Sequence, residues 1–283
     1  MLSLLGLGDN TIDIYVDRGV QYPGGNSLNF AVYAKRLGVD AHYMGCIGDD
    51  AFGAQIEDAL AVENVPSPRL RRTAAQTSWS RVRHMEGDRW FDGCHLYTAE
   101  EYGINLDDEA YLGQFDLVHI GVNSMLDDKI SEIARASKRL SYDFSDKYSE
   151  SSLGRIAPYL EVAFLSKADG DLPAAHALAG HVAKLGPSLV AVTRGSKGAV
   201  CLSHGKLFGQ DVVATEVVDT LGAGDAFSAV LTVEYLKGTD TRSSLELAAE
   251  FASEICQVEA AFGHGRPAIS IPDANRQKQG NCD

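Results

Sequence analysis

The first third of the chain has the hydrophobic pattern of alternating strands and helices. Residues 2–7 form a continuous apolar run, which predicts a buried strand. In residues 12–17 apolar and polar side chains alternate, which predicts a half-exposed strand. A helix with an apolar face is expected after Asn26, and Gly38 is placed to end it. The next expected elements are a strand at 41–47 and a helix at 51–62.

Beyond residue 105 the alternation of strands and helices becomes regular. It predicts a mostly parallel sheet with helices on both faces, which is an α/β fold in three layers. The expected strands are 117–121, 140–144, 162–165, 189–193 and 199–202, and the expected helices lie near 127–138, 151–159 and 173–185.

Polar side chains follow several of these strands directly. Ligands of a parallel sheet bind at the carboxyl ends of its strands. Asp9, Asp143, Ser166 and Thr193 each come just after a predicted strand, so we expect them to converge on one edge. The sequence therefore predicts a polar site at that edge.

Residues 65–98 differ in character from the rest of the chain. Two short strand patterns, 76–84 and 89–93, flank a polar turn, and with residues 12–17 they predict a small separate sheet. We interpret this sheet as a lid, while an ordinary hairpin on the main sheet is the open alternative. The expected division is a lid of residues 12–24 and 73–97 and a main domain of residues 1–11, 25–72 and 98–283.

The composition is that of a globular protein, with 45% hydrophobic and 23% charged residues. A net charge of −14 argues against nucleic-acid binding, which requires a basic surface. The apolar run at the N-terminus is too short to span a membrane, so no membrane association is expected. Five widely spaced cysteines favour free thiols in a reducing cytosol over a disulfide framework. A cytoplasmic protein is therefore expected.

The stretch from Asp219 to Phe227 carries the strongest chemical signal. A Gly222-Ala223-Gly224 turn precedes Asp225, which opens a segment of helical spacing that stops at Gly238. A helix N-terminus leaves backbone N–H groups unpaired and carries a partial positive charge, and the glycines let a large anion approach it. A carboxylate beside such an anion hole can deprotonate a hydroxyl that attacks a phosphoryl group. The alternative is an ordinary helix start with a solvated Asp.

A second polar turn lies at Gly24-Gly25-Asn26-Ser27-Leu28-Asn29. Asn26 and Asn29 are three residues apart, so they share one side of a helix start. Their amides can donate to and accept from hydroxyl groups, which suits a polyol ligand. A glycine turn with Asn26 as the helix cap explains the same residues.

Missing motifs exclude several other enzyme classes. The chain has no Gly-x-x-x-x-Gly-Lys-Ser/Thr sequence of a P-loop kinase, and Gly222-x-Gly224 lacks the third glycine of a dinucleotide fingerprint. Hydrolase and metalloprotease motifs are absent as well. The eight histidines show no metal-ligand spacing. His119 lies in a predicted buried strand, and we interpret it as an interior residue rather than a catalyst.

In combination, these stretches resemble the ribokinase-like (PfkB) carbohydrate kinases. The resemblance implies a three-layer α/β/α ribokinase-like sandwich with a small β-sheet lid, and the matches occur in family order over nearly the whole chain. Residues 219–227 are similar to the C-terminal signature of the family, 24–29 and 45–53 to its N-terminal signature, and 193–198 to its nucleotide-side turn. Within the family, residues 8–15, 24–33 and 142–148 look most like the fructoselysine 6-kinase branch.

The resemblance implies a role for each matching residue. Asp225 matches the catalytic base, and the N–H groups of Gly222, Ala223 and Gly224 match the anion hole that holds the transferring phosphoryl group. Arg89, on the predicted lid, is expected to face the sugar, with a solvated surface Arg as the alternative. The positions matched to sugar contacts are Asp9, Asp13, Gly25, Asn26 and Asn29, and those matched to the nucleotide are Thr193, Gly195, Gly198, Lys147, Gly222 and Gly224.

The chain departs from the family pattern at the metal side. The usual Asn-x-x-Glu, which orders water around Mg²⁺, is replaced by Ser166-Lys167-Ala168-Asp169. Because Mg²⁺ keeps several waters and needs few carboxylates, we expect Asp169 to hold it through water, with Asp171 as competitor. A surface loop carboxylate is the alternative for both. His264 falls where the family places the adenine and sometimes a monovalent cation, so such a cation is a further expected ligand.

The expected reaction is phosphorylation of O6 of a fructosyl-amino acid, with ATP and Mg²⁺. An unmodified sugar or a nucleoside-like riboside is the alternative substrate. A non-catalytic sugar-sensing protein is the alternative of another class, and Asp225 argues against it because binding alone needs no base. The resemblance also implies a homodimer formed through the lid.

Overall fold

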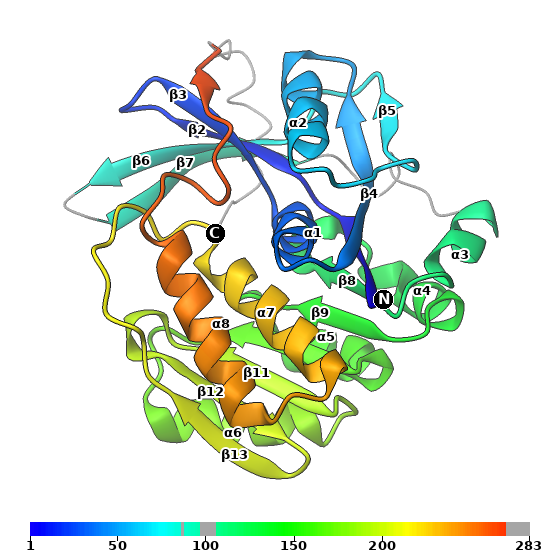
Figure 1. The fold of residues 1–283 in the computed structure, drawn as a ribbon, viewed down its shortest axis with the longest axis vertical. Coiled ribbons are helices and arrows are strands. Elements are labelled where there is room, and N and C mark those ends of the chain that lie inside the picture. Colours follow the sequence, from blue (N-terminus) through cyan, green and yellow to red (C-terminus); the bar gives the residue numbers. More distant parts are fainter. Residues whose placement is uncertain (86–87, 97–105, 270–283) are drawn as a thin grey trace.

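Two sheets organise the part of the chain that the structure describes (Figure 1). The computed structural model describes residues 1–85, 88–96 and 106–269. The larger sheet has nine strands, in the spatial order β13 (Lys206–Gln210), β12 (Ala199–Ser203), β11 (Leu189–Thr193), β10 (Val162–Ser166), β9 (Leu140–Asp143), β8 (Leu117–Gly121), β1 (Ser3–Gly8), β4 (Asp40–Gly48) and β5 (Arg71–Thr73).

Most of this sheet is parallel. Neighbouring strands from β11 to β5 pair in parallel, and β12 and β13 add an antiparallel edge beside β11. The strands at its centre are buried along nearly their whole length, as a sheet covered on both faces requires. Their carboxyl ends therefore form one common edge, where the predicted polar residues come together.

Helices cover both faces of the larger sheet (Figure 1). Each face has its own apolar core, so the molecule has three layers. The predicted α/β/α sandwich with a small additional sheet is confirmed. One face packs against α1 (Asn26–Arg36), α2 (Ala51–Val62), α7 (Ala223–Lys237) and α8 (Thr241–Ile255), and the other against α3 (Leu106–Leu112), α4 (Ile130–Ala136), α5 (Glu150–Ile156) and α6 (Leu172–Ala183).

The smaller sheet begins where β1 ends, because only Asp9 and Asn10 separate β1 from its first strand. The expected half-exposed strand is wrong in one respect, since Ile12 to Tyr15 are all buried. Ile12 and Ile14 join the core beneath α1, and Tyr15 packs in a small cluster of its own. The proposed lid boundaries stay a prediction. The strand order is β14 (Arg266–Pro267), β3 (Val20–Gly24), β2 (Thr11–Tyr15), β6 (Trp79–Met85) and β7 (Asp88–His95).

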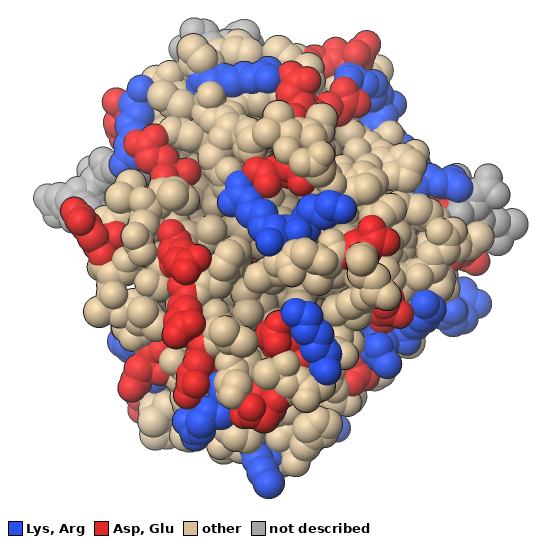
Figure 2. Space-filling model, viewed as in Figure 1, with Lys and Arg blue, Asp and Glu red and all other residues tan. Residues whose placement is uncertain are grey.

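Charges of both signs are spread over the face shown in Figure 2. A run of acidic side chains follows α8, which carries the exposed Glu246, Glu250 and Glu254. The Lys and Arg side chains in this view form separate groups. Opposite charges also pair, as Arg36 does with Glu63 at 2.6 Å.

Two observations concern the compartment expected from the sequence. Cys94 is disulfide-bonded, so the expectation of free thiols throughout is wrong, while Cys46, Cys201 and Cys256 are not in disulfide bonds. No helix among the described residues combines the length and the apolar surface that crossing a membrane requires.

Candidate active site

Asp225 lies in the first turn of α7, at the carboxyl edge of the larger sheet. The helix is preceded by Gly222, whose positive φ of 79° favours glycine. A Cβ atom at Gly222 would also come within 2.6 Å of both the Ala261 Cβ and the Tyr33 hydroxyl. Glycine is therefore required here for conformation and for space. The Ala223 N–H donates a long bond of 3.3 Å to the Thr220 carbonyl, which closes the turn.

The Asp225 carboxylate is held by two side-chain amides from α1. Asn26 Nδ2 donates to one carboxylate oxygen and Asn29 Nδ2 to the other, each at 2.6 Å. The Asn26 amide also donates to Asp143 at 3.0 Å. Residues from the two ends of the chain and from the middle thus meet at one point, as the strand pattern predicted for Asp143.

Asp9 fixes the start of α1 from the end of β1. One of its carboxylate oxygens accepts the Asn26 backbone N–H at 2.7 Å, and the other accepts the Ser27 N–H and hydroxyl. The helix is therefore capped by Asp9, and the alternative in which Asn26 caps it is wrong. With its cap supplied from another strand, the Asn26 side chain is available to reach Asp225. A contact of Asp9 with a sugar stays a prediction.

Three glycines let α1 approach the strands closely. Gly25 has a φ of 110°, and a Cβ atom there would lie 2.6 Å from the Asn10 Cα. A Cβ at Gly6 in β1 would overlap the Ser27 carbonyl, and one at Gly121 in β8 would overlap the Asn26 side chain. These glycines let the first turn of α1 approach closely enough for Asn26 to reach Asp225 and Asp143.

Burial dominates the protonation of the two central carboxyl groups. It raises the pKa of Asp225 to about 7. The hydrogen bonds from the Asn29 and Asn26 amides lower this pKa, and the negative charge of Asp143 raises it further. The pKa of Asp143 is raised to about 6 for the same reason, against the lowering effect of the Ser145 N–H and Asn26. Asp225 is thus poised near neutral pH, where a general base works best.

The predicted nucleotide side is formed by two adjoining turns at the ends of β10 and β11. The Ser166 and Thr193 hydroxyls lie 3.0 Å apart, and the Lys167 N–H donates to the Thr193 carbonyl. Gly198 has a φ of 83° and lies against Gln210, so a side chain there would strike the β13 backbone. Gly195 lies in the second turn, where a Cβ atom would contact only the Ala168 Cβ, at 3.7 Å. Binding of a nucleotide at these residues stays a prediction.

The predicted metal-side residues are placed very differently from one another. Asp169 is almost fully exposed and lies 3.8 Å from Lys167. Asp171 caps α6 by accepting the Ala174 N–H at 2.8 Å, so its carboxylate already has a structural role. Both residues are exposed, and the metal contact expected of Asp169 stays a prediction.

Three other residues were predicted to contact the sugar or the phosphates. Lys147 is exposed just after Asp143 on the same loop. Asp13 is buried in β2, where a Cβ at Gly24 would overlap its carboxylate. Arg89 lies in β7, and its side chain is outside the described residues. The sugar and phosphate roles expected for the three stay predictions.

The smaller sheet is tied to the glycine turn by one buried carboxylate. Tyr15 of β2 donates to Asp219, which also accepts the Leu221 N–H at 2.9 Å and the Ala260 N–H at 3.1 Å. His264 lies four residues after Ala260, and its Nε2 is 2.7 Å from a carboxylate oxygen of Glu63. Its expected proximity to adenine or a monovalent cation stays a prediction.

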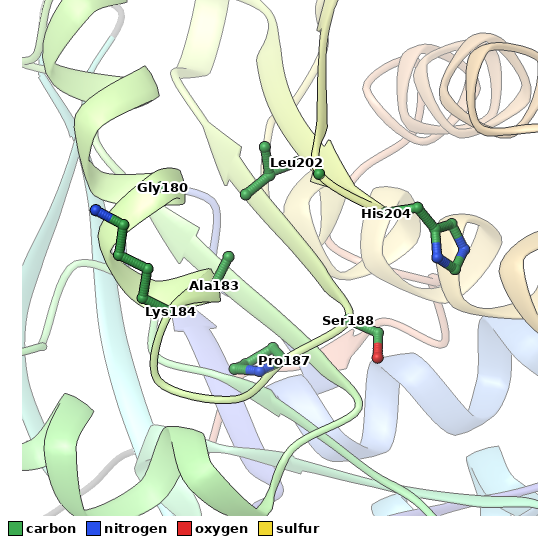
Figure 3. Close-up of a pocket in the computed structure, with 8 residues that line it drawn as sticks. Gly180, Ala183, Lys184, Pro187, Ser188, Leu202 and His204 are labelled. Carbon is green, nitrogen blue, oxygen red and sulfur yellow. The ribbon is translucent and has the colours of Figure 1, made fainter.

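A separate cavity lies at the other end of the molecule. A cavity of about 490 Å³ is lined by α6, the residues before β11 and the end of β12, including Lys184, Ser188 and His204 (Figure 3). These segments lie at the amino ends of the parallel strands, opposite the edge that carries Asp225. The chemistry described above is gathered at the carboxyl edge.

Comparison with known proteins agrees with this arrangement. The model of the pfkB family carbohydrate kinases matches residues 6–263. The chain is 33% identical over 270 residues to the fructosamine kinase FrlD of Bacillus subtilis strain 168, covering 94% of this chain and 95% of that protein. It is 28% identical over 262 residues to fructoselysine 6-kinase of Escherichia coli strain K12, covering 93% and 100%.

A solved structure agrees with the fold. The ribokinase of Arabidopsis thaliana, complexed with ribose and ATP, has a TM-score of 0.77 at 20% identity, covering 94% of this chain and 96% of that one. The family model spans almost all of the described chain, from the end of β1 to the loop after α8. The chain therefore belongs to the pfkB family of carbohydrate kinases.

Proposed function

We propose that this protein transfers the γ-phosphoryl group of ATP to O6 of a fructosyl-amino acid, with Asp225 as the general base. The observation that carries the proposal is the Asp225 carboxylate, held by the Asn26 and Asn29 amides at the start of α7. It combines a base poised near neutral pH with a helix N-terminus that favours the negative charge of phosphate.

In the proposed reaction, Asp225 takes the proton of the sugar hydroxyl. The hydroxyl oxygen then bonds to the γ-phosphorus as the bond to the leaving ADP breaks, and the proton remains on Asp225. The Cβ direction at Gly224 is open, which leaves room for the transferring group beside the start of α7. Asn26 and Asn29 hold the carboxylate in place while it acts.

The residues present fit a nucleotide accompanied by Mg²⁺. A Cβ at Gly224 would meet no atom within 4 Å, so open space lies beside the turn before Asp225, and Ser166 and Thr193 offer hydroxyls at the adjoining strand ends. Among the described residues, no three His, Cys, Asp or Glu side chains gather as a metal cage. This agrees with an ion bound mainly through phosphates and water, with Asp169 as its outer contact, which would neutralise charge on the phosphates.

Two features support a fructosyl-amino acid as the substrate. The relatives at 33% and 28% identity carry the names fructosamine kinase and fructoselysine 6-kinase and align over nearly their whole length. The amine on C1 of such a sugar is cationic, and Asp9, Asp143 and Asp225 give the site an acidic character. A homodimer formed through the smaller sheet is part of the same proposal.

We expect an ATP-coupled assay to show a clear preference for fructosyl-lysine. The panel contains fructosyl-lysine, fructosyl-glycine, fructose, ribose and fructose 6-phosphate, each with Mg²⁺ and ATP. The Asp225→Asn protein, purified in the same way, measures any contaminating kinase. A higher kcat/KM for an unmodified sugar would exclude the proposed substrate, and binding of a sugar without turnover would favour a sensor.

A further inference from the structure

A buried histidine lies directly behind the amide that holds the catalytic base. His119 of β8 is fully buried, and its Nε2 lies 2.9 Å from Asn26 Oδ1. Its Nδ1 lies 2.8 Å from the Ser141 hydroxyl of β9. The ring stacks on Phe30 of α1, with a centroid distance of 3.9 Å. The parallel register of β8 and β9 pairs His119 with Ser141, which fixes this arrangement in the sheet.

The direction of each hydrogen bond follows from the chemistry at the two ends. Carboxylates only accept, so the Asn26 NH₂ group must face Asp225 and Asp143, and its Oδ1 must face His119. His119 therefore donates from Nε2, and its Nδ1 accepts from the Ser141 hydroxyl. Burial lowers the pKa of His119 to about 3, so the ring stays neutral and keeps this tautomer at working pH.

We propose that His119, set by Ser141, is a positioning residue that locks the Asn26 carboxamide with its NH₂ group toward the catalytic carboxylate. The inference rests on the proposed role of Asp225 as the base. An amide free to rotate by 180° would present its oxygen to two carboxylates, and it would then favour the protonated form of Asp225. The Ser141–His119–Asn26 series thus keeps the base ionised and correctly oriented.

Other charged groups near Asp225 raise its pKa, whereas the hydrogen bond from the Asn26 amide lowers it. Asp143 from β9 and Asp9 from the end of β1 both raise the pKa of Asp225. The Tyr33 hydroxyl on α1 is also near enough to feel this charge: burial raises its pKa most, and the negative charge of Asp225 raises it further. None of these groups is removed by a substitution at His119. A change in the pKa of Asp225 in such a variant therefore reports on the Asn26 amide.

The test is the pH dependence of kcat/KM for His119→Phe, which keeps a ring against Phe30 and removes the donor. Only ionised Asp225 accepts a proton, so wild-type activity should fall as the pH drops below about 7. In His119→Phe we expect this acid limb to move up by about one pH unit, with kcat/KM at pH 6 about tenfold below wild type. His119→Gln, which can again donate to Asn26, should restore the limb.

A matched control separates this effect from a loss of packing. His42→Phe makes the same change at a half-buried histidine that bonds to the Tyr111 hydroxyl at 2.7 Å, away from the site. We expect it to lower stability without moving the limb. If His119→Phe does not fold, Ser141→Ala should move the limb in the same direction by a smaller amount.

An unmoved limb in a folded His119→Phe protein, or an equal shift in His42→Phe, would overturn the inference. Failure of the proposed function is recognised separately. In that case Asp225→Asn would itself keep the wild-type activity and acid limb, whatever the result at His119.

Discussion

Replacing Asp225 with Asn should reduce kcat by at least about 10²-fold, because a positioned general base contributes that much or more. The substitution keeps the shape of the side chain and removes a carboxylate whose burial raises its pKa. We therefore expect the variant to fold, with little change in its thermal unfolding. Steady-state kinetics with saturating ATP and sugar measure the loss.

A matched control for this variant is Asp240→Asn. Asp240 caps α8 by accepting the Ser243 N–H at 3.1 Å, and Asn caps helices about as well as Asp. We expect that protein to keep the wild-type kcat. Near-full activity of Asp225→Asn would remove the base from the proposed mechanism.

Replacing Gly222 with Ala should also lower kcat by about 10²-fold, the size of effect seen when one donor of an anion hole is lost. The new methyl group would meet Ala261 and the Tyr33 hydroxyl at 2.6 Å, and alanine resists the φ of 79°. Either effect displaces the turn that precedes α7. We expect this strain to lower the free energy of unfolding by about 1–3 kcal/mol.

Gly238→Ala tests whether backbone strain alone explains that loss. Gly238 ends α7 with a φ of 80°, and no atom lies within 4 Å of the Cβ position. It therefore imposes a similar conformational cost without a collision at the site. We expect Gly238→Ala to lower stability by about 1–2 kcal/mol and to leave kcat unchanged. Equal kcat values for the two variants would contradict the role given to Gly222.

The elements with a continuous apolar pattern were predictable from the sequence. The helix expected at 51–62 is α2, and Gly238 ends α7 as expected from its position after the helical segment. α8 was not predicted, although Asp240 as a cap and Leu245 among its buried residues give a helical signal. β5 and β14 have two or three residues each and exist only through pairing with β4 and β3, so local sequence does not encode them.

The candidate site was predictable in part. The pattern of strands followed by polar residues indicated the shared edge, and Asp225 with Asn26 and Asn29 does meet there. The contact between His119 and Asn26 was not predicted, because it depends on the register of β8 and on how closely α1 approaches that strand. The glycines at 6 and 121 were the available signal, since a buried strand has little other reason to lack side chains facing a helix.

The position of the phosphoryl group in the product distinguishes the proposed reaction from its alternatives. The wild-type protein is incubated with Mg²⁺, ATP and fructosyl-lysine, and the sugar product is examined by phosphorus–proton correlation NMR. We expect one phosphomonoester coupled to the protons on C6 of the sugar, formed in equal amount to ADP. A phosphoryl group on another hydroxyl, or ADP formed with free phosphate and unchanged sugar, would contradict it.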